Sequence, residues 1–305
     1  MGVTEAAILG VGVATLDVIQ EVARYPQEDD EIRALAQRHA RGGNAANTLA
    51  ILRQLGHRCA WVGTQTDDAA AAFVRADLDR RGIDARYAVV YPGGVTPTSH
   101  ILLSRARGSR TIVHYRDLPE LRAEDFAQVP LDEWDWIHFE GRAPEHTARM
   151  IARVRQARPA LPISLEIEKP RPGGEQLLLP VRVLILARAY LQAHGVGDDP
   201  VPVLCQQRER SGAELVLAPW GERGAYAVAA GEAPLFVPAH RPERVLDTLG
   251  AGDVFNAAVI DGVLRGWSSA CVLQRATRLA GCKCGQMGLE LARRCLETSG
   301  DERAA

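Results

Sequence analysis

Short apolar runs alternate with helix-forming stretches along most of the chain, and this alternation restricts the possible folds more than any other feature of the sequence. Six of the runs are apolar almost throughout, as strands that are buried on both faces tend to be. They are AAILGVGV, CAWVGT, WIHFEG, ISLEIE, VLILA and ELVLAPWG. Because strands that alternate with helices usually form a parallel sheet covered on both sides, we expect an α/β fold: a doubly wound, mostly parallel sheet with helices on both faces.

Glycine and proline mark the ends of the predicted helices. Gly56 and Gly82 each follow a stretch with helical periodicity, and Pro159 follows a third. These residue types favour helix ends. Two more helices are expected in the last third of the chain, so that the predicted helices span residues 44–55, 68–81, 145–157, 253–264 and 268–285.

Two segments interrupt this alternation. Residues 96–117 contain SHILLSRARGSRTIVHY, which is typical of a β-hairpin with its turn around Gly108 and Ser109. Residues 12–42 are charged and rich in turn-forming residues, and they separate the first strand from the first helix. We expect these insertions to form a small β-sheet that projects as a lid from a single domain spanning residues 1–305.

Composition argues against several classes of partner. The chain has 305 residues, 47% of them hydrophobic, and a net charge of −2, so we expect neither nucleic acid nor an anionic membrane to bind it by charge. No apolar run approaches the ~20 residues that a membrane-spanning helix needs. The first residues lack the basic segment of a signal peptide. We expect a cytoplasmic protein.

The six cysteines do not have the spacing of a metal site. Cys282 and Cys284 form a C-x-C pair, but no second pair or histidine cluster accompanies them. We therefore expect reduced thiols and no metal ion bound directly by side chains.

Two polar motifs near the N-terminus each have a structural and a functional interpretation. The run GVGVATLD lacks the third glycine of a dinucleotide-binding turn. We expect its Asp17 instead at the carboxyl edge of the sheet, where open α/β sheets bind ligands. In RGGNAANTLA, Asn44 and Asn47 share one helix face. Either Asn44 caps this helix, or both amides and the Gly43 backbone contact the hydroxyls of a polyol.

Three later motifs likewise have both a structural and a functional interpretation. Glu168, Lys169 and Arg171 crowd one strand end, as in a nucleotide or metal site or in an ordinary surface ion pair. The glycine-bounded turn 221–224 follows a buried strand, as in a hairpin. In VLDTLGAGDVFNAAVI, Asp253 stands at the start of a helix, where unpaired N–H groups attract anions. It acts either as a helix cap or in chemistry.

In combination, DTLGAGDVFNAA and RGGNAAN resemble the two signatures of the ribokinase-like sugar kinase family, also called PfkB. The resemblance runs through nearly the whole chain. Other segments are similar, in order and in spacing, to the ketohexokinase (hepatic-type fructokinase) subgroup: GSRTIVHYRDLPE, WIHFEGR, EIEKPR, RVLDTLGAGDVFNA and AGCKCGQMG. The resemblance implies a ribokinase-like fold and a kinase that phosphorylates D-fructose, or a related ketose, at the C1 hydroxyl with ATP and Mg²⁺.

The resemblance also implies roles for individual residues. Asp253 would be the general base, and the backbone of Gly250, Ala251 and Gly252 would form an anion hole for the transferred phosphoryl group. The ketose would lie against Asp17, Asp29, Gly43, Asn44, Asn47 and Asp253. ATP would lie against the same anion hole and Arg110, Gly221, Glu222, Arg223, Gly224 and Cys282. Magnesium would be held mostly by phosphates and water.

Several of these expectations have alternatives. Asp29 stands in an acidic run that solvent can surround, and Arg110 follows a hairpin turn, where arginines are often simply exposed. After VLIL, the sequence Ala187-Arg188-Ala189-Tyr190 replaces the Asn-x-x-Glu motif that organises the magnesium shell in many family members. Two alternative functions therefore remain: a kinase for another sugar or for a nucleoside, and a sensor that binds a sugar or nucleotide without catalysis. The edge strands of the lid suggest a homodimer joined through two lids, as in the family.

Overall fold

A nine-stranded sheet forms the centre of the protein in a computed structural model that describes residues 5–106 and 109–297. The strands are β1 (Ala7–Val11), β4 (Arg58–Val62), β6 (Ile83–Asp84), β10 (Trp136–Glu140), β11 (Ile163–Ile167), β12 (Val183–Leu186), β13 (Leu215–Pro219), β14 (Gly224–Ala229) and β15 (Leu235–Pro238). Their order is β15-β14-β13-β12-β11-β10-β1-β4-β6. All neighbours are parallel except at one edge, where β14 pairs antiparallel with β13 and β15.

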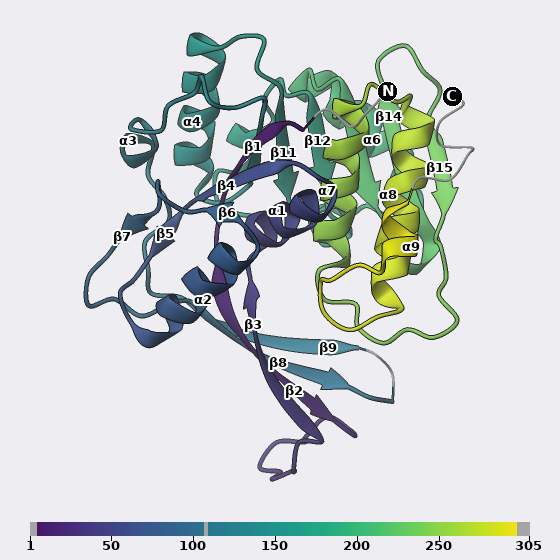
Figure 1. Cartoon of the computed structure of the whole chain (residues 1–305). Coiled ribbons are helices and arrows are strands. Elements are labelled where there is room, and N and C mark those ends of the chain that lie inside the picture. The colour runs from purple at the N-terminus through teal and green to yellow at the C-terminus, as the bar shows by residue number, and fades with distance from the viewer. Residues whose placement is uncertain (1–4, 107–108, 298–305) are drawn as a thin grey trace.

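Helices cover both faces of this sheet (Figure 1). Successive strand residues point to opposite faces, so Ile8 joins one hydrophobic core and Leu9 joins the other. The first core lies under α1 (Asn44–Gln54), α2 (Ala69–Arg80), α7 (Ala251–Leu264), α8 (Ser269–Cys284) and α9 (Arg293–Leu296). The second lies under α3 (Ala123–Phe126), α4 (Pro144–Ala157), α5 (Arg188–Ala193) and α6 (Val201–Ser211).

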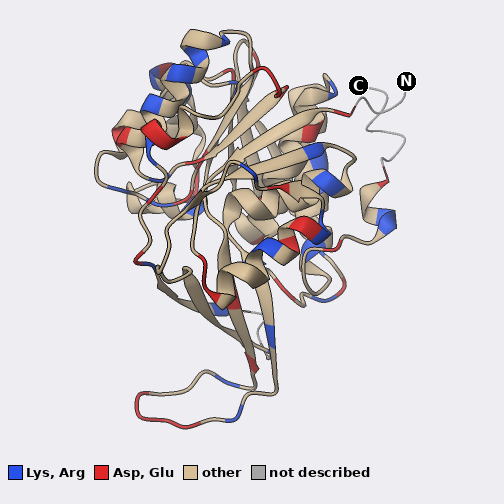
Figure 2. Cartoon of the chain, turned by 60° about the vertical axis from the view of Figure 1, so that its left-hand side comes forward, with Lys and Arg blue, Asp and Glu red and all other residues tan. Residues whose placement is uncertain are grey.

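A second, four-stranded sheet projects from the main body as the lid (Figure 1, bottom). It consists of β2 (Thr15–Val22), β3 (Ala36–Gly42), β8 (Thr98–Ser104) and β9 (Arg110–Tyr115) in the order β3-β2-β8-β9. Strands β2 and β8 are parallel, and the other two pairings are antiparallel. The loop between β2 and β3, at the free end of the lid, contains an acidic run, Glu28–Glu31 (Figure 2). A two-stranded sheet joins β5 (Thr64–Gln65) to β7 (Val89–Val90).

The predicted fold class is confirmed, with a mostly parallel sheet between helix layers and a smaller sheet beside it. All six predicted strands and five predicted helices are present, with ends shifted by up to two residues. Asp68, predicted as the first residue of a helix, is the N-cap of α2 and accepts a hydrogen bond from the Ala71 N–H. The hairpin in residues 96–117 is confirmed as β8 and β9, although Gly108 of its predicted turn lies outside the described residues.

Helices α3, α5, α6 and α9 were not predicted from the sequence, and α9 has only four residues. The first two have four and six residues, too few to show helical periodicity. Helix α6 is mostly polar, and only Leu204, Gln207 and Ser211 are buried. None of the described helices is both long enough and apolar enough to cross a bilayer.

Candidate active site

An open cavity of about 800 Å³ lies between the lid and the carboxyl ends of the central strands. This edge of a parallel sheet is where open α/β folds bind ligands. The cavity is lined by residues of the lid, of α1, of β10 and β11, and of the first turn of α7. It contains most of the predicted site residues, although they lie far apart in the sequence: Asp17, Gly43, Asn44, Asn47, Arg110, Gly250, Gly252 and Asp253.

The first turn of α7 has the geometry of an anion site. Gly250, the N-cap, has φ +78°, a left-handed conformation that glycine adopts without a steric penalty. Among the described residues, no atom accepts a hydrogen bond from the N–H groups of Gly250, Gly252 or Asp253. A Cβ on Gly252 would have no atom within 4 Å, so the space in front of this turn is open. Unpaired N–H groups at a helix N-terminus attract anions, phosphate above all.

Asp253 is the third residue of this helix, and its carboxylate is tied to α1. One oxygen accepts a hydrogen bond of 2.8 Å from Asn47 Nδ2. Asn47 Oδ1 in turn accepts one of 2.8 Å from Arg41, which also forms a 2.8 Å ion pair with Asp77 of α2. Arg41 is only 4% exposed. This buried chain of polar groups fixes the orientation of the Asp253 carboxylate.

Burial raises the pKa of Asp253 from its ordinary value of 3.8 to about 7. The hydrogen bond from Asn47 and the charge of Arg41 work against this rise, whereas the negative charges of Glu140 and Glu168 add to it. Because Asp253 is 6% exposed, little water screens these charges. The carboxylate can therefore take up a proton near neutral pH, as a general base must.

A second buried carboxyl group, Glu166 on β11, lies close to the same point. Burial, and then repulsion from Asp253 and Glu140, raise its pKa well above the usual range. Its Oε2 accepts a hydrogen bond of 3.3 Å from Asn44 Nδ2. The pKa of Glu140 is also raised, mainly by burial. Asp253, Glu140 and Glu166 lie near one another, so the negative charge of each disfavours ionisation of the other two.

Asp17 and Gly43 meet at the start of α1. Asp17, on β2, lines the cavity, and burial raises its pKa although the Thr15 hydroxyl donates a hydrogen bond of 3.1 Å to it. Gly43 has φ +100°, and a Cβ there would lie 2.1 Å from the carbonyl oxygen of Val13. Only glycine allows the end of β3 to approach the chain after β1 so closely. Asp17, the Gly43 backbone and Asn44 thereby form one polar wall of the cavity.

The lid contacts the turn that precedes α7 through two arginines. Arg110 Nη1 donates a hydrogen bond of 2.9 Å to Thr248 Oγ1, and Arg38 Nη2 lies 3.1 Å from Asp247 Oδ2. The exposed Asp29, in contrast, lies in the loop at the free end of the lid and does not line the cavity. The structure therefore places Arg110 beside the anion site but does not bring Asp29 to it.

The other residues predicted to contact the nucleotide lie outside the lining of the cavity. The segment Gly221–Arg223 forms a short 3₁₀ turn between β13 and β14, just after the cavity residue Pro219. Arg223 pairs with Asp198 on the surface. Cys282, on α8, packs against the first core, and burial raises the pKa of its thiol to about 11. Such a thiol is mostly uncharged at neutral pH and a weak nucleophile.

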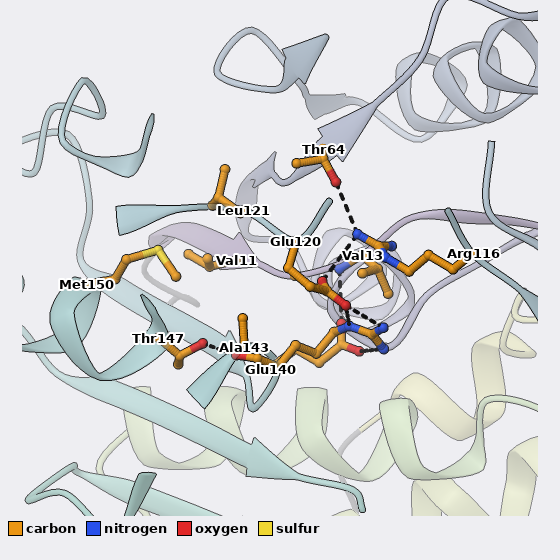
Figure 3. A pocket seen from close by; sticks show the side chains of 12 residues that line it. Val11, Val13, Thr64, Arg116, Glu120, Leu121, Glu140, Ala143, Thr147 and Met150 are labelled. Carbon is orange, nitrogen blue, oxygen red and sulfur yellow. Dashed lines mark hydrogen bonds and ion pairs between the residues drawn. The ribbon is translucent and has the colours of Figure 1, made fainter. Parts of the chain in front are cut away.

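A cavity of about 20 Å³ adjoins the large one, and Figure 3 shows its charged network. Glu140 accepts a hydrogen bond of 3.0 Å from the Val13 N–H and lies 3.5 Å from Arg142. Arg142 also pairs with Glu120 at 2.7 Å, and Glu120 pairs with Arg116 at 3.2 Å. The network holds Glu140 in place, and Glu140 acts on Asp253 through its charge.

Three residues of the site were not predicted from the sequence: Arg41, Glu140 and Glu166. All three stood in quoted segments, two of them within strands predicted to be buried. A charged residue inside a buried strand needs a partner, and that was the available signal. In the described part of the chain, no three His, Cys, Asp or Glu side chains are grouped so that they could hold a metal ion.

Comparison with known proteins bears on this arrangement. A family model described as pfkB family carbohydrate kinase matches residues 6–294. The chain is 39% identical to mouse (Mus musculus) ketohexokinase over 296 residues, which cover 94% of this chain and 98% of that protein. Two solved ribokinase structures superpose over 96% of this chain and 98% of theirs. That of Arabidopsis thaliana, complexed with ribose and ATP, has a TM-score of 0.78 at 21% identity. That of Giardia lamblia has a TM-score of 0.80 at 18% identity.

Proposed function

Since the chain belongs to the pfkB family of carbohydrate kinases, we propose that it transfers the terminal phosphoryl group of ATP to the C1 hydroxyl of D-fructose or a related ketose. The observation that carries this proposal is the pairing of a buried carboxylate, Asp253, with three unpaired N–H groups in the same helical turn. The ketose is chosen because of the 39% identity to ketohexokinase across nearly the whole chain.

In this proposal the two parts of the turn act on different groups. Asp253 accepts the proton of the attacking C1 hydroxyl, so that its negative charge meets a hydroxyl and not a phosphate. The N–H groups of Gly250, Gly252 and Asp253 point at the transferred phosphoryl group and stabilise the charge that spreads over its oxygens. Phosphoryl transfer depends mainly on such positioning and charge stabilisation. The proposed anion hole thus uses the N–H of Asp253 in place of that of Ala251, which donates a hydrogen bond of 3.4 Å to the Thr248 carbonyl oxygen.

The polar wall of the cavity would hold the sugar. Asp17, Asn44 and Asn47 present carboxylate and amide groups, which can bind hydroxyls as acceptors and donors. The Gly43 backbone lies between them. Because Asn47 also donates to Asp253, a sugar bound there would be held within reach of the base.

ATP and Mg²⁺ fit the residues that are present to different degrees. The open space at Gly252 and the unpaired N–H groups suit a phosphate. Magnesium would arrive with the nucleotide and neutralise phosphate charge, held by phosphate oxygens and water. In the described ranges, the segment Ala187–Tyr190 adds no carboxylate to that shell.

The pH dependence of catalysis follows from the raised pKa of Asp253. A general base must be deprotonated, so we expect kcat/KM for the sugar to rise with pH and level off above about pH 7. Glu168→Gln should move this rise to lower pH, because the charge of Glu168 helps to raise the pKa of Asp253. Initial rates between pH 5 and 9 would check this. A rise that stays at the same pH in the variant would point to a titration of ATP, not of Asp253.

ADP release from MgATP tests the function itself. We expect turnover with D-fructose, with a higher kcat/KM than for other ketoses, ribose or nucleosides. Phosphate on C1 of the product would be seen by NMR. A better acceptor elsewhere in the panel would contradict the proposed sugar but not the enzyme class. Sugar binding without ADP release would favour a sensor.

The lid supports a proposal of a homodimer. Strand β9 lies at the edge of the lid and is exposed along its whole length, with Ile112, Val113 and Tyr115 at 47%, 67% and 54% exposure. Exposed apolar edge strands tend to pair. We expect light scattering to give a dimer mass for the parent and a monomer mass for Val113→Asp. A monomeric parent would contradict the proposal.

A further inference from the structure

Arg188 is the first residue of α5, directly after β12, and it lines the large cavity. It is exposed, and no carboxylate lies within 4 Å of its guanidinium in residues 5–106 and 109–297. Three other arginines of the cavity already pair with carboxylates: Arg38 with Asp247, Arg41 with Asp77 and Arg142 with Glu120. An unpaired cation in a ligand cavity is available for an anion.

Two contacts hold Arg188 at this position. Its guanidinium lies 5.9 Å from the ring centroid of Trp220, within the range of a cation–π interaction. A Cβ on Gly221 would lie 3.4 Å from Arg188 Nη1. Because Trp220 is buried, it is a rigid support. The guanidinium therefore rests against the start of the turn 221–224, the segment proposed for the nucleotide.

Both buried carboxyl groups and arginines line the cavity. The carboxyl groups with raised pKa, Asp17, Glu166 and Asp253, lie by the wall proposed for the sugar. Three arginines of the cavity have no carboxylate partner in the described chain: Arg110 on the lid, Arg171 after β11, and Arg188 after β12. Hydroxyl groups suit the buried carboxyl groups, and a polyphosphate suits the arginines.

We propose that Arg188 binds the polyphosphate chain of the nucleotide and neutralises part of its charge. This inference rests on the proposed kinase function and adds a residue to its nucleotide site. Arg188 lies in the segment that replaces Asn-x-x-Glu. A fixed guanidinium stabilises negative charge on phosphate directly, whereas the replaced motif acts through the magnesium shell. The substitution thus exchanges one means of holding phosphate charge for another.

The proposal predicts which ligands depend on Arg188. A charge-assisted hydrogen bond to phosphate strengthens binding by roughly 10- to 100-fold. Arg188→Gln should therefore weaken ATP binding by about that factor, ADP binding less, and AMP binding least. Sugar affinity should not change. The loss should be larger without Mg²⁺, because the metal otherwise neutralises part of the same charge.

Isothermal titration of the full chain with ATP, ADP, AMP and fructose, with and without Mg²⁺, is the test. Arg188→Lys should recover part of the ATP affinity, since it restores the charge without the planar fork. Arg182→Gln is the matched control: Arg182 precedes the same strand at its other end, pairs with Glu214 on the surface, and does not line the cavity. We expect this control to bind all ligands like the parent.

The outcomes separate the inference from the function on which it rests. Equal losses for ATP and AMP, or no loss for either, in a parent that binds ATP would overturn the role of Arg188 and leave the kinase standing. A parent that binds no ATP would overturn both. If Arg182→Gln lost as much ATP affinity as Arg188→Gln, the loss would reflect the overall charge of the protein, and this too would contradict the proposal.

Discussion

Asp253→Asn is expected to lower kcat by about 10²–10⁴-fold, the usual contribution of a general base, and at the same time to stabilise the fold. The amide cannot accept the proton of the sugar hydroxyl. It can still accept the hydrogen bond from Asn47, so the geometry of the turn should persist. A residue that acted only as a helix cap would show the opposite pattern, a loss of about 1 kcal/mol in stability with little change in rate.

The gain in stability follows from the sign of the pKa shift. A carboxyl whose pKa is raised in the folded state makes ionisation oppose folding, so stability falls as pH rises from 3.8 towards about 7. The shift corresponds to at most about 4 kcal/mol. We expect Asp253→Asn to gain about 1–3 kcal/mol above pH 7, roughly 1.5 °C in Tm for each kcal/mol.

Asp261→Asn provides a matched control on the same helix. Asp261 is also buried, but hydrogen bonds from His57 and Arg265 lower its pKa in spite of burial. Its charge therefore stabilises the fold at neutral pH, and Asp261→Asn should lose about 3 kcal/mol, as in a broken buried pair, while kcat stays near that of the parent. Thermal unfolding and single-turnover rates of both variants check this. An Asp253→Asn protein with normal kcat would remove the general base from the proposed mechanism.

Gly43→Ala is expected to have the largest effect on stability. The left-handed backbone costs a non-glycine residue about 1–2 kcal/mol. Here the added Cβ would also lie 2.1 Å from the Val13 carbonyl oxygen, a backbone atom that cannot move aside alone. Together these should lower the free energy of unfolding by about 3 kcal/mol or more. If the variant folds, its backbone must shift, and sugar KM should rise by about 10²-fold because the polar wall is displaced.

Gly56→Ala is the control that separates the steric clash at Gly43 from the cost of the left-handed backbone. Gly56 ends α1 as Gly43 begins it, and its φ of +95° is close to the +100° of Gly43. A Cβ on Gly56 would meet no atom within 4 Å. We expect Gly56→Ala to lose only the conformational cost of about 1–2 kcal/mol and to keep the parent's sugar KM. Urea unfolding of both variants compares them. Equal losses would mean that close packing at Gly43 has no role.

Local pattern was sufficient for most of the architecture. The buried strands and the helices that end at Gly or Pro are each formed by a continuous stretch of four to sixteen residues. Parallel strands then bring their carboxyl ends to one edge, which is why Asp17, Asn44, Asn47 and Asp253 share a cavity. The predicted pairing of a glycine turn with a helix start at residues 250–253 is likewise a local feature, and the structure has it.

The chain sequence by itself determined the fold class, the lid, the family and most of the residues that face the cavity, because periodicity, turn chemistry and short motifs are properties of neighbouring residues. Only the tertiary structure decided the electrostatics. The pKa of Asp253 depends on burial and on charges from β10 and the end of β11, more than 80 residues away in the sequence. In the same way, the fold decides that no carboxylate of the described residues lies close to Arg188. The strength of a charge interaction depends on the distance between the groups and on how far they are shielded from water, and folding sets both.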